Sequence, residues 1–462
     1  MSTVLQIWES ICHERHGPSL VTLIHRHIAR NAPCGHCLCW GKLAMSAAID
    51  ANQQPKRAGM LLRAMLAQNV GTGCAFGGLG VSVLALQDRF HSSLGMATMG
   101  LSLAVLTMTA LGPMVARLIN RYSLRIVMTG GVITSLIGYL ALAYAPTMPH
   151  ALAACAFLVG PGAALFAVLP PAVLASGWYP HDRGKVLGIA FLPLLVTIIP
   201  LLGVEIIQRH GLTAFYLSIV ALHLLLLPLI LGIEDPPAEP LADQDAFAPP
   251  SGSAQVVILG SLFFWLIVLG DGILNGTAIA GSAHMLPIVT GYGVPVETGA
   301  FLLSISGAAS ILGSLVAGYA CDRVGAARTL TLAAVGFALA WSVIAMTGWL
   351  PMLALASVLI GFCGASVFPP ISALAVQIFG VDALPKVLGL LGVMTLPFTF
   401  AMSPAAGWLH DLAGSYQPAF ATLIATCSLA AVTFFSISRH LARQGLISQP
   451  SPCSLPSPAE PT

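Results

Sequence analysis

One acidic residue, Asp271, lies near the middle of a long apolar stretch that runs from about Gln255 to Val289. An ionisable side chain at such a depth in a membrane is costly, so it is a candidate for function by default. Asn275 lies four residues further on and therefore shares a helical face with Asp271. We expect this pair to contribute to a site for a substrate or a coupling proton. The alternative is a structural role, in which Asp271 bonds to a backbone amide or to a polar side chain of a neighbouring helix.

The residues around Asp271, Gly270–Thr277, read GDGILNGT and predict a loosened or broken helix. Broken helices expose backbone dipoles at mid-membrane, where transporters bind substrates and ions. His284, in the outer half of the same stretch, could titrate near neutral pH, although a solvated interfacial residue is an equal alternative. Polar residues in other apolar stretches that could line the same pathway are Asn69, Thr72, Ser306, Ser310 and Thr395.

The composition is that of a polytopic membrane protein. Hydrophobic residues make up 57% of the 462 residues and charged residues only 8%, with a mean hydropathy of +0.88. The formal net charge of +2 gives no indication of nucleic-acid binding, and we expect no such partner. Apolar runs long enough to span a bilayer are predicted at about 60–86, 94–116, 125–145, 149–176, 186–207, 212–232, 256–289, 298–320, 329–349, 352–377, 387–409 and 418–438.

The distribution of basic residues predicts the orientation. Loops on the cytoplasmic side of a membrane protein carry an excess of Lys and Arg. With the N-terminus inside, only Arg89 and Arg209 lie outside. The basic residues then on the cytoplasmic side are Lys56, Arg57, Arg117, Arg121, Arg125, Arg183, Lys185, Arg323, Arg328, Lys386, Arg439 and Arg443. We therefore expect a multi-pass protein of the cell (inner) membrane with both termini in the cytoplasm.

The apolar run Phe301–Cys321 ends in a charged loop with a distinctive spacing, Gly318-x-x-x-Asp322-Arg323-x-Gly325, followed by Arg328. Gly318 would let two helices approach, and Gly325 would permit a tight turn. Asp322 could pair with an Arg or cap the following helix, while Arg323 and Arg328 hold the loop inside. This pattern closely resembles the signature loop between the second and third helices of each half in the major facilitator superfamily.

A degenerate second copy lies about 200 residues earlier, in Leu111–Arg125. Aligning Arg121 with Arg323 puts Ala116, Asn120 and Ser123 at the positions of Gly318, Asp322 and Gly325, and Arg125 closes the copy. Two similar halves are typical of transporters built from repeated bundles. The resemblance implies an all-α polytopic membrane protein with twelve transmembrane helices in two pseudo-symmetric six-helix halves. It also implies transport by alternating access, with both loops acting in gating.

The expected organisation follows from these spans. Residues 1–56 form an N-terminal extension whose native start is uncertain, and a Pro-rich acidic linker at 234–254 separates six-helix bundles at 57–233 and 255–439. Residues 440–462 form a Pro/Ser-rich tail. The extension contains four potential metal ligands, Cys34, His36, Cys37 and Cys39, but their crowding favours no metal site.

The loops Gly177–Lys185 and Gly407–Tyr416, together with the degenerate copy, look like the monocarboxylate and oxalate/formate branch of the superfamily. This resemblance implies symport of a small organic anion with protons. Branch members carry an Asp and an Arg four apart in the eighth span, where this sequence has Ser310 and Ser314. Because no Arg replaces that charge at mid-depth, a proton-coupled exporter of drugs or amphipathic metabolites is an open alternative.

Other protein classes lack their motifs. The sequence has no Walker-type nucleotide loop, no Gly-x-Ser-x-Gly and no His-Glu-x-x-His, so we expect neither an ATP-driven pump nor an enzyme, and no cofactor. A solute receptor that does not transport is a third class, for which the linker and tail offer no folded appendage. The expected partners are a small-molecule substrate, protons and the lipid bilayer, and we expect the protein to function as a monomer.

Three local expectations complete the sequence picture. Glu205 and Arg209 are four residues apart and should form an interfacial ion pair. Gly73-x-x-x-Gly77 should provide a seam for close helix packing. Five Cys within or at the ends of spans should be small buried thiols without a disulfide pattern: Cys74, Cys155, Cys321, Cys363 and Cys427.

Overall fold

The computed structural model describes residues 56–179, 183–236, 258–380 and 383–443, and their regular structure is helical. In this part of the chain, nine helices are long and apolar enough to cross a membrane, and two bent pairs of helices raise the number to eleven. The longest candidate, Val186–Leu231, is divided at Gly211, where the backbone has a positive φ of 83°. Counting its two parts separately gives the twelve predicted spans.

The first half of the described chain contains the bent pair Lys56–Val81 and Val83–Phe90, followed by four further spans and the break at Gly211. Three segments in this half are π-helical. The elements after residue 72 are η1 (Gly73–Gly78), α4 (Leu79–Val81), α5 (Val83–Phe90), α6 (Leu94–Ala110), α7 (Gly112–Arg121), α8 (Leu124–Ala143), α9 (Met148–Ala154), η2 (Cys155–Val159), α10 (Gly160–Ala163), η3 (Ala164–Val168), α11 (Leu169–Trp178), α12 (Arg183–Ala190) and α13 (Leu194–Leu231).

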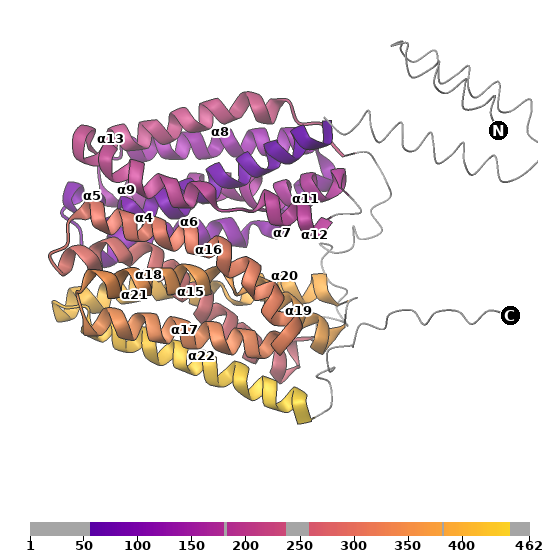
Figure 1. The fold of residues 1–462 in the computed structure, drawn as a ribbon. Helices are drawn as coiled ribbons and strands as arrows, with labels where there is room; N and C mark the ends of the chain where they lie inside the picture. The colour runs from indigo at the N-terminus through magenta and orange to yellow at the C-terminus, as the bar shows by residue number, and fades with distance from the viewer. Residues whose placement is uncertain (1–55, 180–182, 237–257, 381–382, 444–462) are drawn as a thin grey trace, which may run out of the picture. The chain divides into compact units, whose positions relative to one another are not determined.

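The second half consists of longer, less interrupted helices that run side by side along the bundle (Figure 1). They are α15 (Leu262–Gly291), α16 (Val296–Val324), α17 (Ala326–Met346), α18 (Leu350–Ala365), α19 (Phe368–Phe379), α20 (Leu384–Met394), α21 (Leu396–Ala413) and α22 (Gln417–Arg443).

Buried apolar side chains form two clusters that follow the two halves of the chain. One cluster consists almost entirely of residues between Met60 and Ile233, and the other of residues between Ile258 and Leu441. Four residues of the second half join the first cluster, and they come from the later part of α15 and the start of α16: Ile279, Ala283, Leu286 and Ala300. The later part of α15 therefore packs against both halves.

The glycines of the second half that have the tightest surroundings lie where α16 crosses α18. A Cβ atom added to Gly361 would lie 1.8 Å from the Ser306 carbonyl oxygen, and one added to Gly313 would lie 2.1 Å from the Phe362 carbonyl oxygen. Only glycine fits such backbone contacts. Gly318 faces open space, so it brings no two helices together in this conformation.

Gly325 has the conformation that the sequence predicts. Its φ of 92° lies in the left-handed region and separates α16 from α17. The signature loop therefore needs its second glycine for a turn, whereas the crossing of α16 depends on Gly313, five residues before Gly318.

Helix α15 runs without interruption through Asp271. The predicted break is wrong because the glycines around Asp271 serve packing against α21 and α22. Added Cβ atoms would lie 2.5 Å from the ring of Phe434 at Gly270, 2.8 Å from that of Phe398 at Gly272, and 2.6 Å from the Met402 side chain at Gly276. Because these three glycines have no side chain, their large neighbours lie directly against the α15 backbone.

Several local predictions are confirmed. Glu205 and Arg209 form an exposed ion pair, and Gly73 packs against Leu195 of α13, with an added Cβ only 2.6 Å from the Leu195 Cβ. The five Cys of the described residues are free thiols; four are buried and Cys321 is half-buried.

Candidate functional site

Asp271 and Asn275 lie together on a partly exposed stripe of α15. The stripe continues through Ala278 and Ser282, and the residues that flank it are buried. The Asn275 side-chain amide donates to the Asp271 Oδ1 at 2.8 Å and to the Asp271 carbonyl oxygen at 3.0 Å. Asp271 is thus held from its own helix, and its Oδ2 makes no hydrogen bond to any described residue.

The first span carries a second polar pair, Gln68 and Thr72. The Gln68 amide donates to the Thr72 hydroxyl oxygen at 3.2 Å, and that hydroxyl donates to the Gln68 carbonyl oxygen at 2.8 Å. The Gln68 Oε1 is buried and has no hydrogen-bond partner among the described residues. The sequence analysis named Thr72 but missed Gln68. Gln68 lies four residues before Thr72 and therefore shares its helix face, which was enough to indicate that the two side chains form a pair.

The two polar pairs lie on helices that meet at one crossing. An added Cβ at Gly80 would lie 2.7 Å from the Ser282 carbonyl oxygen, so the first span touches α15 there. At a rise of 1.5 Å per residue, Thr72 lies roughly 12 Å before this crossing and Asp271 roughly 16 Å before it. If both helices cross the membrane in the same direction, as predicted, the two pairs lie at similar depth. The π-helix η1 separates Thr72 from Gly80, and such π-segments are frequent at functional sites.

The side chain of Asn69 is hydrogen-bonded to other groups of the protein. Its amide nitrogen donates to the carbonyl oxygens of Met65 at 3.0 Å and Leu192 at 2.9 Å, and its Oδ1 accepts from the Leu195 amide at 3.0 Å. Leu192 and Leu195 flank the break between α12 and α13. The structure therefore places Asn69 where it fixes this break, next to the Gln68–Thr72 pair.

The other predicted polar residues are spread over different elements. The Ser310 hydroxyl donates to the Gly307 carbonyl oxygen at 2.6 Å, and the Thr395 hydroxyl donates to the Leu391 carbonyl oxygen at 2.8 Å. Ser306 is buried at the α16–α18 crossing. Within the described ranges, no hydrogen bond joins Ser306, Ser310 or Thr395 to Asp271.

His284 is buried, with only 1% of its surface exposed, so the solvated interfacial alternative is wrong. Its Nε2 lies 2.8 Å from the Ser403 carbonyl oxygen, which can only accept, so Nε2 carries the hydrogen. Its Nδ1 then accepts from the Tyr416 hydroxyl at 3.1 Å. His284 lies about 20 Å along α15 from Asp271 at the helical rise and belongs to a separate cluster.

The intact signature loop makes few contacts in this structure. Asp322 is exposed, and its carboxylate makes no hydrogen bond or ion pair with the described residues. The N-cap residue of α17 is Gly325, and no side chain caps this helix, so the predicted capping role of Asp322 is wrong for this conformation. The Arg323 guanidinium lies over the Tyr319 ring, 5.1 Å from its centroid, and Arg328 is exposed.

The degenerate copy is tied to the end of α13. The Arg125 Nε donates to the Ile233 carbonyl oxygen at 2.8 Å, and the Asp235 Oδ1 accepts from the Leu124 amide at 2.8 Å. Asp235 thereby provides at the start of α8 the carboxylate that the copy lacks at Asn120. Sequence reasoning missed Asp235 because it lies in the linker, 111 residues from its partner. Asn120 is exposed, and Arg121 lies near the Tyr122 ring.

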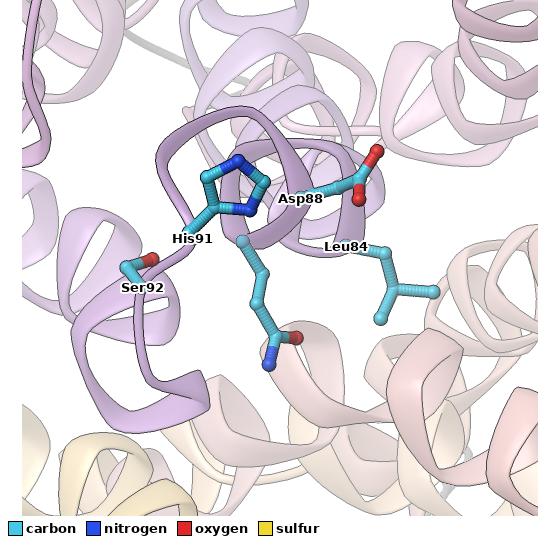
Figure 2. A pocket seen from close by; sticks show the side chains of 5 residues that line it. Leu84, Asp88, His91 and Ser92 are labelled. Carbon is cyan, nitrogen blue, oxygen red and sulfur yellow. The ribbon is translucent and has the colours of Figure 1, made fainter.

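A pocket of about 410 Å³ lies at the end of α5 (Figure 2). It is lined by Leu84, Gln87, Asp88, His91 and Ser92. Asp88 and His91 are exposed, and the pocket is far along the first span from the Gln68–Thr72 pair. It is therefore distinct from the Asp271 site.

No group of metal-ligating side chains exists within the described residues. The predicted cluster Cys34, His36, Cys37 and Cys39 lies outside them.

Comparisons with known proteins agree with the fold. The model of the family described as "Major Facilitator Superfamily" matches residues 65–310 and 272–454. Comparison with curated protein sequences gave no match.

Solved structures share the fold at low sequence identity. A bacterial homologue of the human lysosomal transporter Spinster, inward-facing and unoccupied, is 14% identical with a TM-score of 0.65, covering 84% of this chain and 98% of that one. A D-xylose-proton symporter is 17% identical with a TM-score of 0.64, covering 82% and 97%. The nucleoside transporter NupG is 14% identical with a TM-score of 0.63, covering 82% and 99%. At such identities the likeness concerns the fold alone.

Proposed function

This chain belongs to the Major Facilitator Superfamily, and we propose that it is a proton-coupled secondary transporter that moves a small organic solute by alternating access. The observation that carries the proposal is the Asp271–Asn275 pair, an acidic residue and its amide partner on a partly exposed face in the middle of α15. A transporter of this kind needs a mid-membrane group that binds a proton or a substrate in one state and releases it in another.

The arrangement of Asp271 suits reversible proton binding. The Asn275 amide bonds only to Oδ1, so the pair leaves Oδ2 available. A proton on Oδ2 removes the charge and turns the group into a hydrogen-bond donor. The same side chain could therefore bind different groups of a substrate before and after protonation.

The side chains at this depth indicate which net charge the substrate is expected to carry. Asp271, Asn275, Gln68 and Thr72 provide one negative charge, two amides and a hydroxyl, and no Lys or Arg lies on the described stripe of α15. A neutral solute or an amphipathic cation can bind to these groups directly. A small organic anion, as the monocarboxylate-like loops imply, would bind only after protonation of Asp271, whose hydroxyl could then donate to the anion.

A panel of labelled solutes tests this proposal. Purified protein in liposomes is given neutral polyols, amphipathic amines and small monocarboxylates, with and without an imposed pH gradient. We expect at least one class of solute to move in a way that depends on the pH gradient. Uptake of an acid would support symport with protons, and expulsion of amines would support exchange for protons. Saturable binding of a solute without any movement across the membrane would identify a receptor instead and would contradict the proposal.

Contacts between the two halves indicate which state of the transport cycle this structure represents. The first span meets α15 at Gly80 and Ser282, and the Gln208 amide donates to the Glu297 carboxylate at 2.6 Å. These contacts lie beyond Asp271 toward the end of the spans that is predicted to be extracellular. We infer that this end is closed and that the Asp271 site communicates with the cytoplasm. We also propose that both termini and the linker lie in the cytoplasm and that the chain functions as a monomer, as the sequence predicts.

Asp322 provides a test of gating by the signature loop. Its carboxylate is unengaged in this structure, so we propose that it acts in the opposite state, when the cytoplasmic ends approach. Asp322→Ala should slow transport severalfold and leave the ranking of substrates unchanged, because the loop is remote from the Asp271 site. Initial rates for three solutes of the transported class measure both quantities. A changed ranking would contradict a pure gating role.

A further inference from the structure

We propose that Asp411 closes the gate at the membrane end opposite the signature loop, by binding the first turn of α6 across the interface between the halves. We call this contact of Asp411 with Leu94 and Gly95 the Asp411 latch. The inference rests on the proposed function, because a gate has meaning only in a protein that alternates between open states.

The hydrogen bonds of α6 carry the argument. The first four amides of an α-helix have no partner within the helix. Asp411 Oδ1 accepts from the Leu94 amide at 3.1 Å, and its Oδ2 accepts from the Gly95 amide at 2.9 Å. The Met96 and Ala97 amides bond to the side chain and carbonyl oxygen of Ser93. The Ala97 bond is the first one within the helix, so the amides that need other partners are those of Leu94, Gly95 and Met96, and two of these three bond to a residue of the other half.

Both the charge and the packing fit this contact. A carboxylate at a helix N-terminus is stabilised by the partial positive charge there, and both of its oxygens are used. The backbones of the two helices touch beside it, since an added Cβ at Gly407 would lie 2.7 Å from the Gly95 Cα, and one at Gly95 would lie 3.1 Å from the Trp408 amide nitrogen. Thr98, one turn further along α6, is fully buried at this crossing.

A cluster of rings connects the latch to the helix that carries Asp271. The His410 and Tyr416 rings are 4.4 Å apart, and the His410 Nδ1 lies 3.6 Å from Asp411 Oδ1. The Tyr416 hydroxyl donates to His284 of α15 at 3.1 Å, and His284 donates to the Ser403 carbonyl oxygen of α21. Helices α15 and α21 therefore form one block at this end, so a displacement of α15 moves Asp411 relative to α6.

The contact is suited to reversible opening. Within the described residues, two hydrogen bonds join the Asp411 side chain to the first half, and the Asp411 and His410 side chains are 23% and 30% exposed. When the halves separate, water can replace the carboxylate at α6 and the amides at Asp411. Because the donors are backbone amides of a helix, closure restores the same geometry.

Labelling of a cysteine at the crossing tests the proposal. Thr98→Cys provides a thiol that is fully buried while the latch is closed. An impermeant maleimide labels this thiol when it becomes exposed, in sealed vesicles of each orientation. The labelling rate of the chain without this cysteine is subtracted, because the chain has cysteines of its own. Asp411→Asn removes the charge and places an amide donor against two backbone donors. We expect labelling to accelerate about tenfold, the factor that corresponds to losing one charge-assisted hydrogen bond.

The matched control is Asp88→Asn. Asp88 is an exposed carboxylate at the same membrane end and makes no described side-chain hydrogen bond to α6 or α21, so its replacement should leave labelling unchanged. If Thr98→Cys does not reach the membrane, Ser282→Cys is the second reporter, because its backbone touches Gly80 at the neighbouring crossing.

The outcomes separate this inference from the proposed function. Faster labelling in Asp411→Asn alone supports the latch even if no solute of the panel is transported, since the assay needs no substrate. Equal labelling of wild-type protein, Asp411→Asn and Asp88→Asn would overturn it. A fall in thermal stability of Asp411→Asn without faster labelling would also overturn it, because Asp411 would then only stabilise the fold.

Discussion

Asp271→Asn should abolish accumulation driven by a pH gradient and leave the protein folded in the membrane. Asparagine has nearly the same shape as aspartate and can still bond to Asn275, but it cannot bind or release a proton. One pH unit is worth about 1.4 kcal/mol per coupled proton and supports about tenfold accumulation of a neutral solute. In the variant the ratio of internal to external solute should fall to that measured without a gradient.

Two further measurements make this result specific. Exchange of labelled for unlabelled solute without a gradient should persist in Asp271→Asn if the residue couples protons, and should be lost if it only binds the substrate. Asp88→Asn, the same chemical change at an exposed position, should accumulate solute like the wild type. Full gradient-driven accumulation by Asp271→Asn would remove Asp271 from the coupling mechanism.

Gly361→Ala should severely destabilise the second half, whereas Gly318→Ala should not. The new methyl group at residue 361 would lie 1.8 Å from the Ser306 carbonyl oxygen, so α16 and α18 would have to separate. Overpacking of this kind costs about 1–3 kcal/mol or more, because no flexible side chain can move away. The same methyl at residue 318 meets open space, and alanine in a helix is favoured over glycine by about 0.5–1 kcal/mol.

Thermal unfolding in detergent, together with the amount of protein that reaches the membrane, measures this difference. We expect a large loss for Gly361→Ala and an unchanged or slightly raised Tm for Gly318→Ala. Equal stability of the two variants would contradict the crossing geometry. A loss confined to Gly318→Ala would restore the role in packing that its place in the signature loop first suggested.

Features that depend on neighbouring residues in the chain were accessible from the sequence. The length of apolar runs predicted the spans, because hydrocarbon thickness fixes how many residues each helix needs. The pair Asp271 and Asn275 followed from a spacing of four, and the structure joins them by a hydrogen bond. The turn at Gly325 followed from the tolerance of glycine for positive φ.

Features that depend on contacts across the fold were not accessible. The glycines around Asp271 indicated a broken helix, but their effect depends on Phe398 and Phe434, which lie on other helices. For His284, a solvated interfacial position stood as an equal alternative because its partners on α21 and before α22 lie more than a hundred residues away. Asp411 passed unnoticed for the same reason, since its donors on α6 are 316 and 317 residues earlier.

The most direct test of the account is the movement of protons that accompanies a transported solute. Liposomes that contain the purified protein and a trapped pH-sensitive dye are given the solute without an imposed pH gradient. Proton-coupled transport predicts a change in internal pH on solute addition with wild-type protein and none with Asp271→Asn. Movement of labelled solute with no pH change in wild-type vesicles would contradict proton coupling and, with it, the role proposed for Asp271.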